Sequence, residues 1–349
     1  MTAPSAIRAK PRRRRLISRV HVGSTSYAWA SIGAAVALYV ANVGFQPSFA
    51  SPGNWASILA VTAPFLLIGM AQALPVLAGN GGLDLSLGPL MGFVTVLIAI
   101  ELVPAGISAP ELLIPVVLAI GFGAGMVNGF LVAFVRLPAI IATLGAYLFY
   151  TGFGLYLLPS PSGNVPGWLM HLSRSYGPIP AMLVPLFAVA VFWLLLTRTA
   201  YRRNLLAVGG DDRAAYTAGA NVALIRCSAY AFGGMLAAVA GLALAATLGS
   251  GDSTVGPPYT ITSIAAVALG GISLSGGRGG LLGGAAGGAI IFLIQNLLTV
   301  ANVSVFELDI ANGIMLILAL ALNSFVLARR RTGLAKLELA GRQRLQEAA

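Results

Sequence analysis

One carboxylate stands in a stretch where most neighbours are glycine or apolar residues. This is Asp84, in the sequence GNGGLDLSLG at residues 79–88, between two long apolar runs. An ionisable residue within a membrane segment is costly and therefore indicates a function. Three roles are open: Asp84 caps the following helix through backbone amides, pairs with Arg136 or Arg278, or binds a solute or coupling ion. We favour capping, because the residue falls near a predicted membrane surface.

Neutral polar side chains in the apolar runs are suited to hydrogen-bonding a polar solute. Amides and hydroxyls offer donors and acceptors without placing a charge in the membrane. Glycine-rich breaks at membrane depth are tolerated where the freed backbone faces protein or water, and in transporters they often border the path. The predicted path residues are Gly82, Asp84, Ser86, Asn128, Thr143, Gly271, Ser273, Gln295 and Asn296.

The sequence lacks the residue sets of the common enzyme classes. Its two histidines, His21 and His171, are far apart, and the single cysteine, Cys227, excludes an intramolecular disulfide. No Gly-x-x-x-x-Gly-Lys-Ser/Thr phosphate loop occurs, so any ATP chemistry requires another chain. We expect no catalytic residue, no metal and no cofactor on this chain.

A polar loop at residues 198–224 interrupts the apolar runs. It contains GGDDRAAYTAG, in which Asp211 or Asp212 can cap a helix and Gly219 can end it in the left-handed conformation. A short capped helix here favours a docking role over a solvated connector. The predicted docking residues are Gly209, Gly210, Asp211, Arg213, Ala214, Ala215 and Gly219.

The elements that must position these residues are membrane helices. The 349 residues are 58% hydrophobic and 9% charged, whereas soluble domains carry roughly 25% charged residues. Each crossing needs about 20 apolar residues. The sequence predicts an all-α, polytopic inner-membrane bundle with about ten spans, at 27–45, 55–78, 84–103, 112–135, 138–158, 178–197, 225–248, 259–275, 280–300 and 308–328.

The net charge is +11, and the positions of the basic residues agree with this topology. With both termini in the cytoplasm, only Arg174 of the 21 lysines and arginines falls outside, as the positive-inside rule requires. Residues 1–26 and 329–349 become cytoplasmic tails around a transmembrane domain at 27–328. The apolar run from Tyr27 is longer than a usual signal-peptide core, which favours a retained span over a cleaved signal. The acidic residues expected on the outer side are Glu101, Glu111, Asp252, Glu307 and Asp309.

Two of the glycine-rich breaks resemble each other. Residues 81–88 read GGLDLSLG and residues 270–277 read GGISLSGG, so that Asp84 corresponds to Ser273. Transporters often contain internal repeats. The match suggests a duplication with both copies in the same sense, although chance similarity in a glycine-rich chain is the alternative.

Four stretches, in order, resemble the transmembrane permease subunits of ABC importers, in the ribose and simple-sugar branch. The resemblance runs from about residue 55 to 325. The stretches are GGLDLSLGPLMGF, GMVNGFLVAFVRLPAIIATLGAYLFYTG, GGDDRAAYTAGANV and ITSIAAVALGGISLSGGRGGLLGGAAGG. Departures from the family pattern occur at Asp211, Ala220 and Gly283–Gly284, and they affect subfamily and substrate more than fold.

The resemblance implies a division of labour. A periplasmic binding protein delivers the solute, two permease subunits, identical or different, form the path, and cytoplasmic ATPases drive it through the loop at 198–224. The implied solute is a monosaccharide such as ribose, with nucleosides, signalling sugars or branched-chain amino acids as alternatives. A passive channel or secondary carrier is the rival class, but a proton-coupled carrier usually has ionisable residues deep in its spans.

Overall fold

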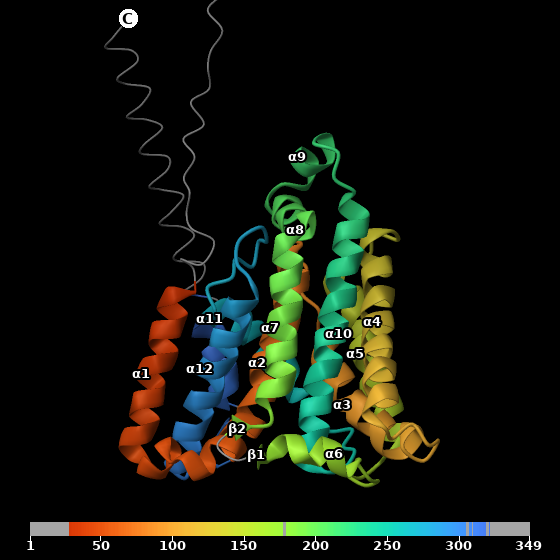
Figure 1. The fold of residues 1–349 in the computed structure, drawn as a ribbon. Coiled ribbons are helices and arrows are strands. Elements are labelled where there is room, and N and C mark those ends of the chain that lie inside the picture. Colours follow the sequence, from red (N-terminus) through yellow and green to blue (C-terminus); the bar gives the residue numbers. More distant parts are fainter. Residues whose placement is uncertain (1–27, 177–178, 305–306, 309, 319–320, 322–349) are drawn as a thin grey trace, which may run out of the picture.

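The computed structural model describes residues 28–176, 179–304, 307–308, 310–318 and 321, and within these ranges the protein is a helical bundle (Figure 1). The strands described are two-residue segments, β1 (Ser175–Tyr176) and β2 (Ile179–Pro180), paired antiparallel. This confirms the all-α prediction. The α-helices are α1 (Trp29–Phe45), α2 (Trp55–Leu77), α3 (Leu87–Leu97), α4 (Pro110–Ala133), α5 (Ala139–Leu157), α6 (Gly167–Met170), α7 (Leu183–Arg198), α8 (Ala200–Gly210), α9 (Asp212–Thr217), α10 (Val222–Leu248), α11 (Pro258–Leu269) and α12 (Leu281–Val300).

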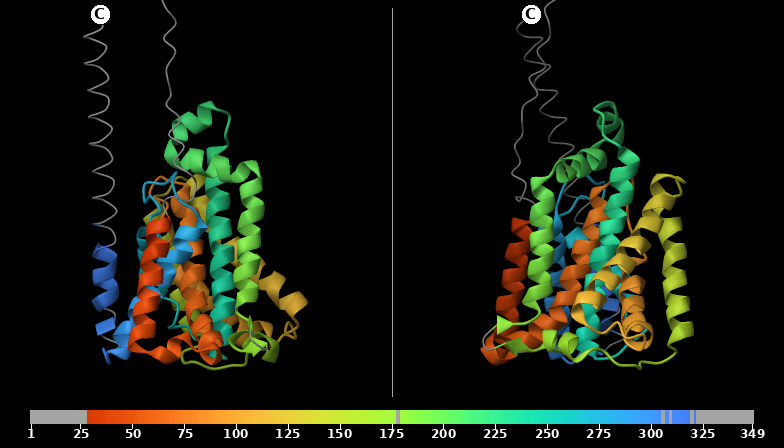
Figure 2. Two further views of the ribbon diagram at one scale, coloured as in Figure 1. Left: turned by 60° about the vertical axis from the view of Figure 1, so that its left-hand side comes forward. Right: turned by 45° about the vertical axis from the view of Figure 1, so that its right-hand side comes forward.

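The long helices lie side by side, and the short ones lie across the two ends of the bundle. Helices α8 and α9 lie at one end, which we call the α9 end, and α6 lies with β1 and β2 at the other (Figure 1). Helix α8 is bent by 80° from α7 and crosses the α9 end (Figure 2). The sequence predicted one short helix in this loop; the structure has two, because Thr199 caps the first through the Tyr201 amide.

Length and composition identify several described helices as membrane spans. Five qualify alone, and the bent α7–α8 pair makes a sixth if it counts as one span. Three shorter apolar helices, Trp29–Phe45, Leu87–Leu102 and Pro258–Leu269, match further predicted spans. Of the tenth predicted span, 308–328, residues 309, 319–320 and 322–328 lie outside the described residues, as do both predicted tails. The count of ten therefore stays a prediction. The five are Pro52–Leu77, Pro110–Ala133, Ala139–Leu157, Val222–Leu248 and Leu281–Val300.

The two similar breaks are flanked by helices of different length. Residues 78–86 follow the long α2 and precede the short α3, whereas residues 270–280 follow the short α11 and precede the long α12. Both breaks contact α8 at the α9 end. Two copies of a repeat that run in the same direction must lie at the same end in this way. The order of long and short helices is reversed, however, so the similarity of the breaks does not extend to their flanks.

Close contact between α4 and α10 depends on glycines spaced four residues apart. A Cβ on Gly125 would overlap the Tyr230 carbonyl, and one on Gly129 would lie 2.5 Å from the Cys227 carbonyl oxygen. Small residues at this spacing let membrane helices approach until their backbones touch. Gly121 forms the third contact of the series, against Gly234 and Ala238.

We expect Gly125→Ala to lower the free energy of unfolding by about 1–3 kcal/mol, the usual effect of overpacking. Gly123→Ala is the matched control, because a Cβ there meets nothing within 4 Å on the same helix. Thermal unfolding of the two purified variants in detergent measures the difference. Equal unfolding temperatures would show that α4 and α10 do not need this close approach.

Candidate translocation and coupling site

Asp84 lies in the break between α2 and α3 and is completely buried. Its Oδ1 accepts hydrogen bonds from the backbone amide of Ser86 at 2.9 Å and from the Ser86 hydroxyl at 2.7 Å. On α4, Asn128 Nδ2 lies 3.4 Å from both carboxylate oxygens and donates to Ser86 Oγ at 2.8 Å. The carboxylate thus holds the turn that precedes α3 and ties that turn to α4. It does not cap the helix itself, because the N-cap residue of α3 is Ser86 and its side chain makes no capping hydrogen bond.

The second interpretation of Asp84, an ion pair with Arg136 or Arg278, is not seen among the described residues. Arg136 and Arg278 both have exposed side chains, and in the described part of the chain the salt bridge that forms joins Arg226 to Asp212. The physical reason is that both arginines lie on surface turns at the α9 end, whereas Asp84 is enclosed between helices. The third interpretation, solute or ion binding, stays a prediction.

Gln72 of α2 also bonds to this break, and the sequence did not predict its role. With its Nε2 facing the Asp84 carbonyl, the amide donates to that oxygen at 2.9 Å and accepts from the Asp84 amide at 3.1 Å. From α11, Thr260 Oγ1 donates to the Leu85 carbonyl at 3.1 Å. A glutamine within an apolar helix was the available signal, because buried polar groups need partners. We call Gln72, Asp84, Ser86 and Asn128 the polar cluster.

Other predicted path residues lie around the same break or around the second one. Thr143 of α5 is buried 3.5 Å from the Leu83 carbonyl oxygen, and a Cβ on Gly82 would overlap the Pro75 carbonyl. In the second break Gly271 has φ +72°. The Ser273 hydroxyl is buried there, with no hydrogen-bond partner among the described residues. The second break is therefore shaped by its backbone and has no counterpart of the Asp84 carboxylate.

Gln295 and Asn296 lie elsewhere. Gln295 Nε2 donates to Asn312 Oδ1 at 2.7 Å, and Asn296 Nδ2 donates to Asn42 Oδ1 at 2.7 Å. These bonds join α12 to α1 and to residues 310–318, on the side of the bundle opposite α4 and α5 (Figure 1). The structure does not bring these two residues to the polar cluster.

The predicted capped helix in the loop is present as α9. Asp211, rather than Asp212, is the cap: its Oδ1 accepts from the amides of Arg213 at 3.1 Å and Ala214 at 3.0 Å. The helix ends in a Schellman arrangement, with Gly219 at φ +90° donating to Tyr216 and with Ala220 donating to the Ala215 carbonyl. Apart from buried Ala215, the residues of α9 are exposed. A rigid helix therefore presents an open surface.

Four glycines join this loop to both breaks. A Cβ on Gly79 would lie 2.7 Å from the Gly209 carbonyl oxygen, one on Gly276 would overlap the Gly79 Cα, and one on Gly277 would lie 2.5 Å from the Gly210 amide nitrogen. The Gly277 amide also donates to the Leu77 carbonyl at 3.1 Å. We call Gly79, Gly209, Gly276 and Gly277 the glycine junction. It brings the end of α8 into backbone contact with residues 78–86 and 270–280.

Comparison with known proteins is consistent with this geometry. The family model described as "Branched-chain amino acid transport system / permease component" matches residues 54–322. No solved structure matches the chain significantly.

Three curated relatives agree with that match. The ribose import permease protein of Bacillus subtilis (strain 168) is 32% identical over 290 residues, 80% of this chain and 87% of that protein. The galactose/methyl galactoside import permease protein of Salmonella typhimurium (strain LT2) is 31% identical over 306 residues, 82% and 90%. A probable ABC transporter permease protein of Escherichia coli (strain K12) is 33% identical over 298 residues, 83% and 86%. The family match covers most of the chain, the fold is all-α, and an exposed loop contacts both glycine-rich breaks. The chain therefore belongs to this permease family and is a membrane transport subunit of an ABC importer.

Proposed function

We propose that this chain forms the translocation path for a monosaccharide, with ribose as the first candidate, together with a second permease subunit. A periplasmic binding protein delivers the sugar, and separate ATPase subunits bind ATP and Mg. The names of the relatives, which are import permeases for ribose and for galactose and methyl galactoside, support a sugar. The family description keeps branched-chain amino acids as the alternative class of solute.

The observation that carries the coupling proposal is the glycine junction. An ATPase docked on α9 would move α8, and α8 contacts the backbone of both breaks through Gly79, Gly209, Gly276 and Gly277. Since a short rigid helix transmits displacement without bending, the breaks would shift together. In this scheme Asp84 holds one break in shape, while neutral groups such as Asn128 and Thr143 face the solute.

The distribution of charge supports an inner-membrane location with the α9 end in the cytoplasm. Arg202 and Arg203 lie on α8, Arg213 lies on α9, and Arg136 lines one pocket with Tyr216 of α9. Basic residues concentrate on the cytoplasmic side of membrane proteins. At the opposite end, Glu101 and Glu111 flank a segment that bonds to α6 through the Ser108 carbonyl. Both termini would then be cytoplasmic.

The decisive experiment is a pull-down of the full chain from detergent-solubilised membranes, followed by mass spectrometry and reconstituted uptake. Co-purification of an ATPase, with ATP-dependent uptake of labelled ribose when the binding protein is added, would support the proposal. Uptake of leucine or a nucleoside instead would replace the substrate class. Solute movement in liposomes by the chain alone, without ATP, would favour the channel or carrier.

Arg213→Glu should remove most of the solute-stimulated ATP hydrolysis, at least about tenfold, because it reverses an exposed charge on the docking surface of α9. Arg213→Lys keeps the charge and is the matched control. Gly219→Leu should have a similar effect, since φ +90° strains a branched side chain. Stimulation is measured in liposomes containing equal amounts of inserted protein. Normal stimulation in Arg213→Glu and Gly219→Leu would reject docking on α9.

A further inference from the structure

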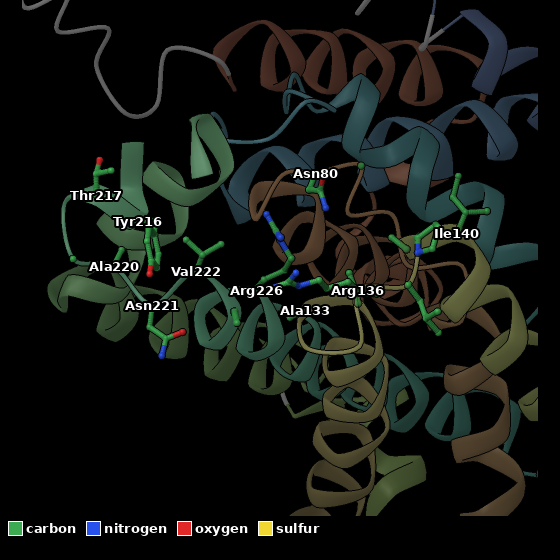
Figure 3. A pocket seen from close by; sticks show the side chains of 17 residues that line it. Asn80, Ala133, Arg136, Ile140, Tyr216, Thr217, Ala220, Asn221, Val222 and Arg226 are labelled. Atoms are coloured by element: carbon green, nitrogen blue, oxygen red, sulfur yellow. The ribbon is translucent and has the colours of Figure 1, made fainter. Parts of the chain in front are cut away.

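A pocket of about 1290 Å³ opens at the α9 end of the bundle. It lies between the turn that joins α4 to α5, the end of α9, the start of α10 and the first break (Figure 3). Its polar lining includes Asn80, Arg136, Asn221 and Arg226. The polar cluster around Asp84 contributes none of the residues that line it.

Arg226 is the reason to expect a ligand here. Only 8% of this residue is exposed, yet its Nε and Nη2 have no hydrogen-bond acceptor among the described residues. Arg226 forms an ion pair with Asp212, whose Oδ2 lies 3.5 Å from Nη2 and whose side chain is 48% exposed. A guanidinium has five N–H donors, and leaving buried donors unpaired is costly. The pocket therefore offers an unfilled position for an acceptor.

Two further features make that acceptor an anion. Arg136 extends into the same part of the pocket as Arg226, and Asn80 faces it (Figure 3). Asn221, Val222 and Ala223, at the start of the 27-residue helix α10, line the wall. The amino end of a long helix attracts negative charge through its free amides and its dipole. The carboxylate of Asp212 would repel an anion, but Asp212 is not among the residues that line the pocket.

The surroundings of the pocket indicate a lipid rather than a dissolved ion. Leu137 and Ile140 line it and are 38% and 53% exposed, and Ile141 beside them is 62% exposed. Ile140 and Ile141 lie in the first turn of α5, Leu137 lies just before it, and most of α5 is exposed or half-buried in the single chain. Basic pockets between membrane helices on the cytoplasmic side bind anionic headgroups. A phosphate at Arg226 with acyl chains along α5 would satisfy both the charges and the apolar rim.

We propose that this pocket binds the headgroup phosphate of an anionic lipid from the leaflet at the α9 end. The assignment of that leaflet to the cytoplasm rests on the proposed function. Binding of lipid, however, needs neither ATPase nor solute and is tested separately from it.

The test is native mass spectrometry of the full chain, purified in detergent and titrated with phosphatidylglycerol or phosphatidylcholine. We expect Arg226→Gln and Arg136→Gln each to weaken phosphatidylglycerol binding about five-fold, the usual effect of removing one interfacial arginine. Arg203→Gln should bind like the wild type, because exposed Arg203 lies at the same end but outside the pocket. Phosphatidylcholine binding should not differ among the variants.

Three results would overturn the proposal. Equal phosphatidylglycerol affinity in all four proteins would show that the pocket does not select the lipid. Displacement of the lipid by millimolar inorganic phosphate would assign the site to a soluble phosphate compound. Loss of ATPase co-purification in both pocket variants, with lipid binding intact, would show that an acidic side chain of the ATPase fills the pocket. Since Arg136 is exposed, its variant remains informative if Arg226→Gln fails to fold.

Discussion

Replacing Gly209 with alanine should remove most of the ATP-driven uptake, whereas the same replacement at Gly210 should leave it near the wild-type rate. A Cβ on Gly209 would overlap the Leu77 carbonyl and lie 2.6 Å from the Gly277 amide nitrogen. A Cβ on the adjacent Gly210 meets nothing within 4 Å. Overpacking typically costs about 1–3 kcal/mol, and here it would push α8 away from both breaks. We expect uptake to fall at least about tenfold.

The measurement is sugar uptake in liposomes that hold equal amounts of permease, ATPase and binding protein. ATPase co-purification serves as the control, because a variant that has lost only the junction still docks through α9. Equal loss of uptake in the two variants would mean that glycine is needed for contact with the ATPase. Normal uptake in both would remove the junction from the mechanism.

Asp84→Leu should destabilise the chain by about 2–4 kcal/mol, since hydrogen bonds to a charged acceptor contribute about 1.5–3 kcal/mol and their orphaned donors add a penalty. It removes the acceptor of the Ser86 amide and hydroxyl and leaves Asn128 without its carboxylate. Asp84→Asn keeps one oxygen where Oδ1 lies. We therefore expect that variant to unfold near the wild-type temperature and to transport at more than about half the wild-type rate.

Thermal unfolding in detergent and uptake per inserted molecule separate the interpretations of Asp84. If the carboxylate holds the break, stability and uptake fall together in Asp84→Leu and both survive in Asp84→Asn. If it binds a solute or a coupling ion through its charge, Asp84→Asn folds normally and does not transport. That second pattern would contradict a purely structural role.

Local features of the fold were predictable from the sequence because they depend on neighbouring residues. The cap at Asp211 and the left-handed Gly219 follow from residue types within one short helix. The ends of the helices beside the glycine-rich breaks were less predictable. Helix α11 ends at Leu269, while the predicted span continued to residue 275, because apolar content alone does not show where glycines turn the chain.

Contacts between distant residues were not predictable. Gly79, Gly209 and Gly276 meet only once the helices pack, and their residue type also fits ordinary helix contacts. Residue type likewise could not show that Gln295 bonds to Asn312 and lies away from the polar cluster. Gln72 was detectable in principle, but its partner is the backbone of Asp84, which has no signature in sequence.

The contact of α8 with the two breaks has a mechanical consequence, because it is made by main chain. A long side chain between two helices can change rotamer and absorb a small displacement, which introduces slack into any linkage. Glycines in contact have no rotamers, and the Gly277 amide is tied to the Leu77 carbonyl at 3.1 Å. The linkage is therefore stiff, so that a movement of α8 would reach residues 78–86 and 270–280 at the same time and undiminished. The two breaks would then move as one unit at the α9 end, with no state in which one break has moved and the other has not.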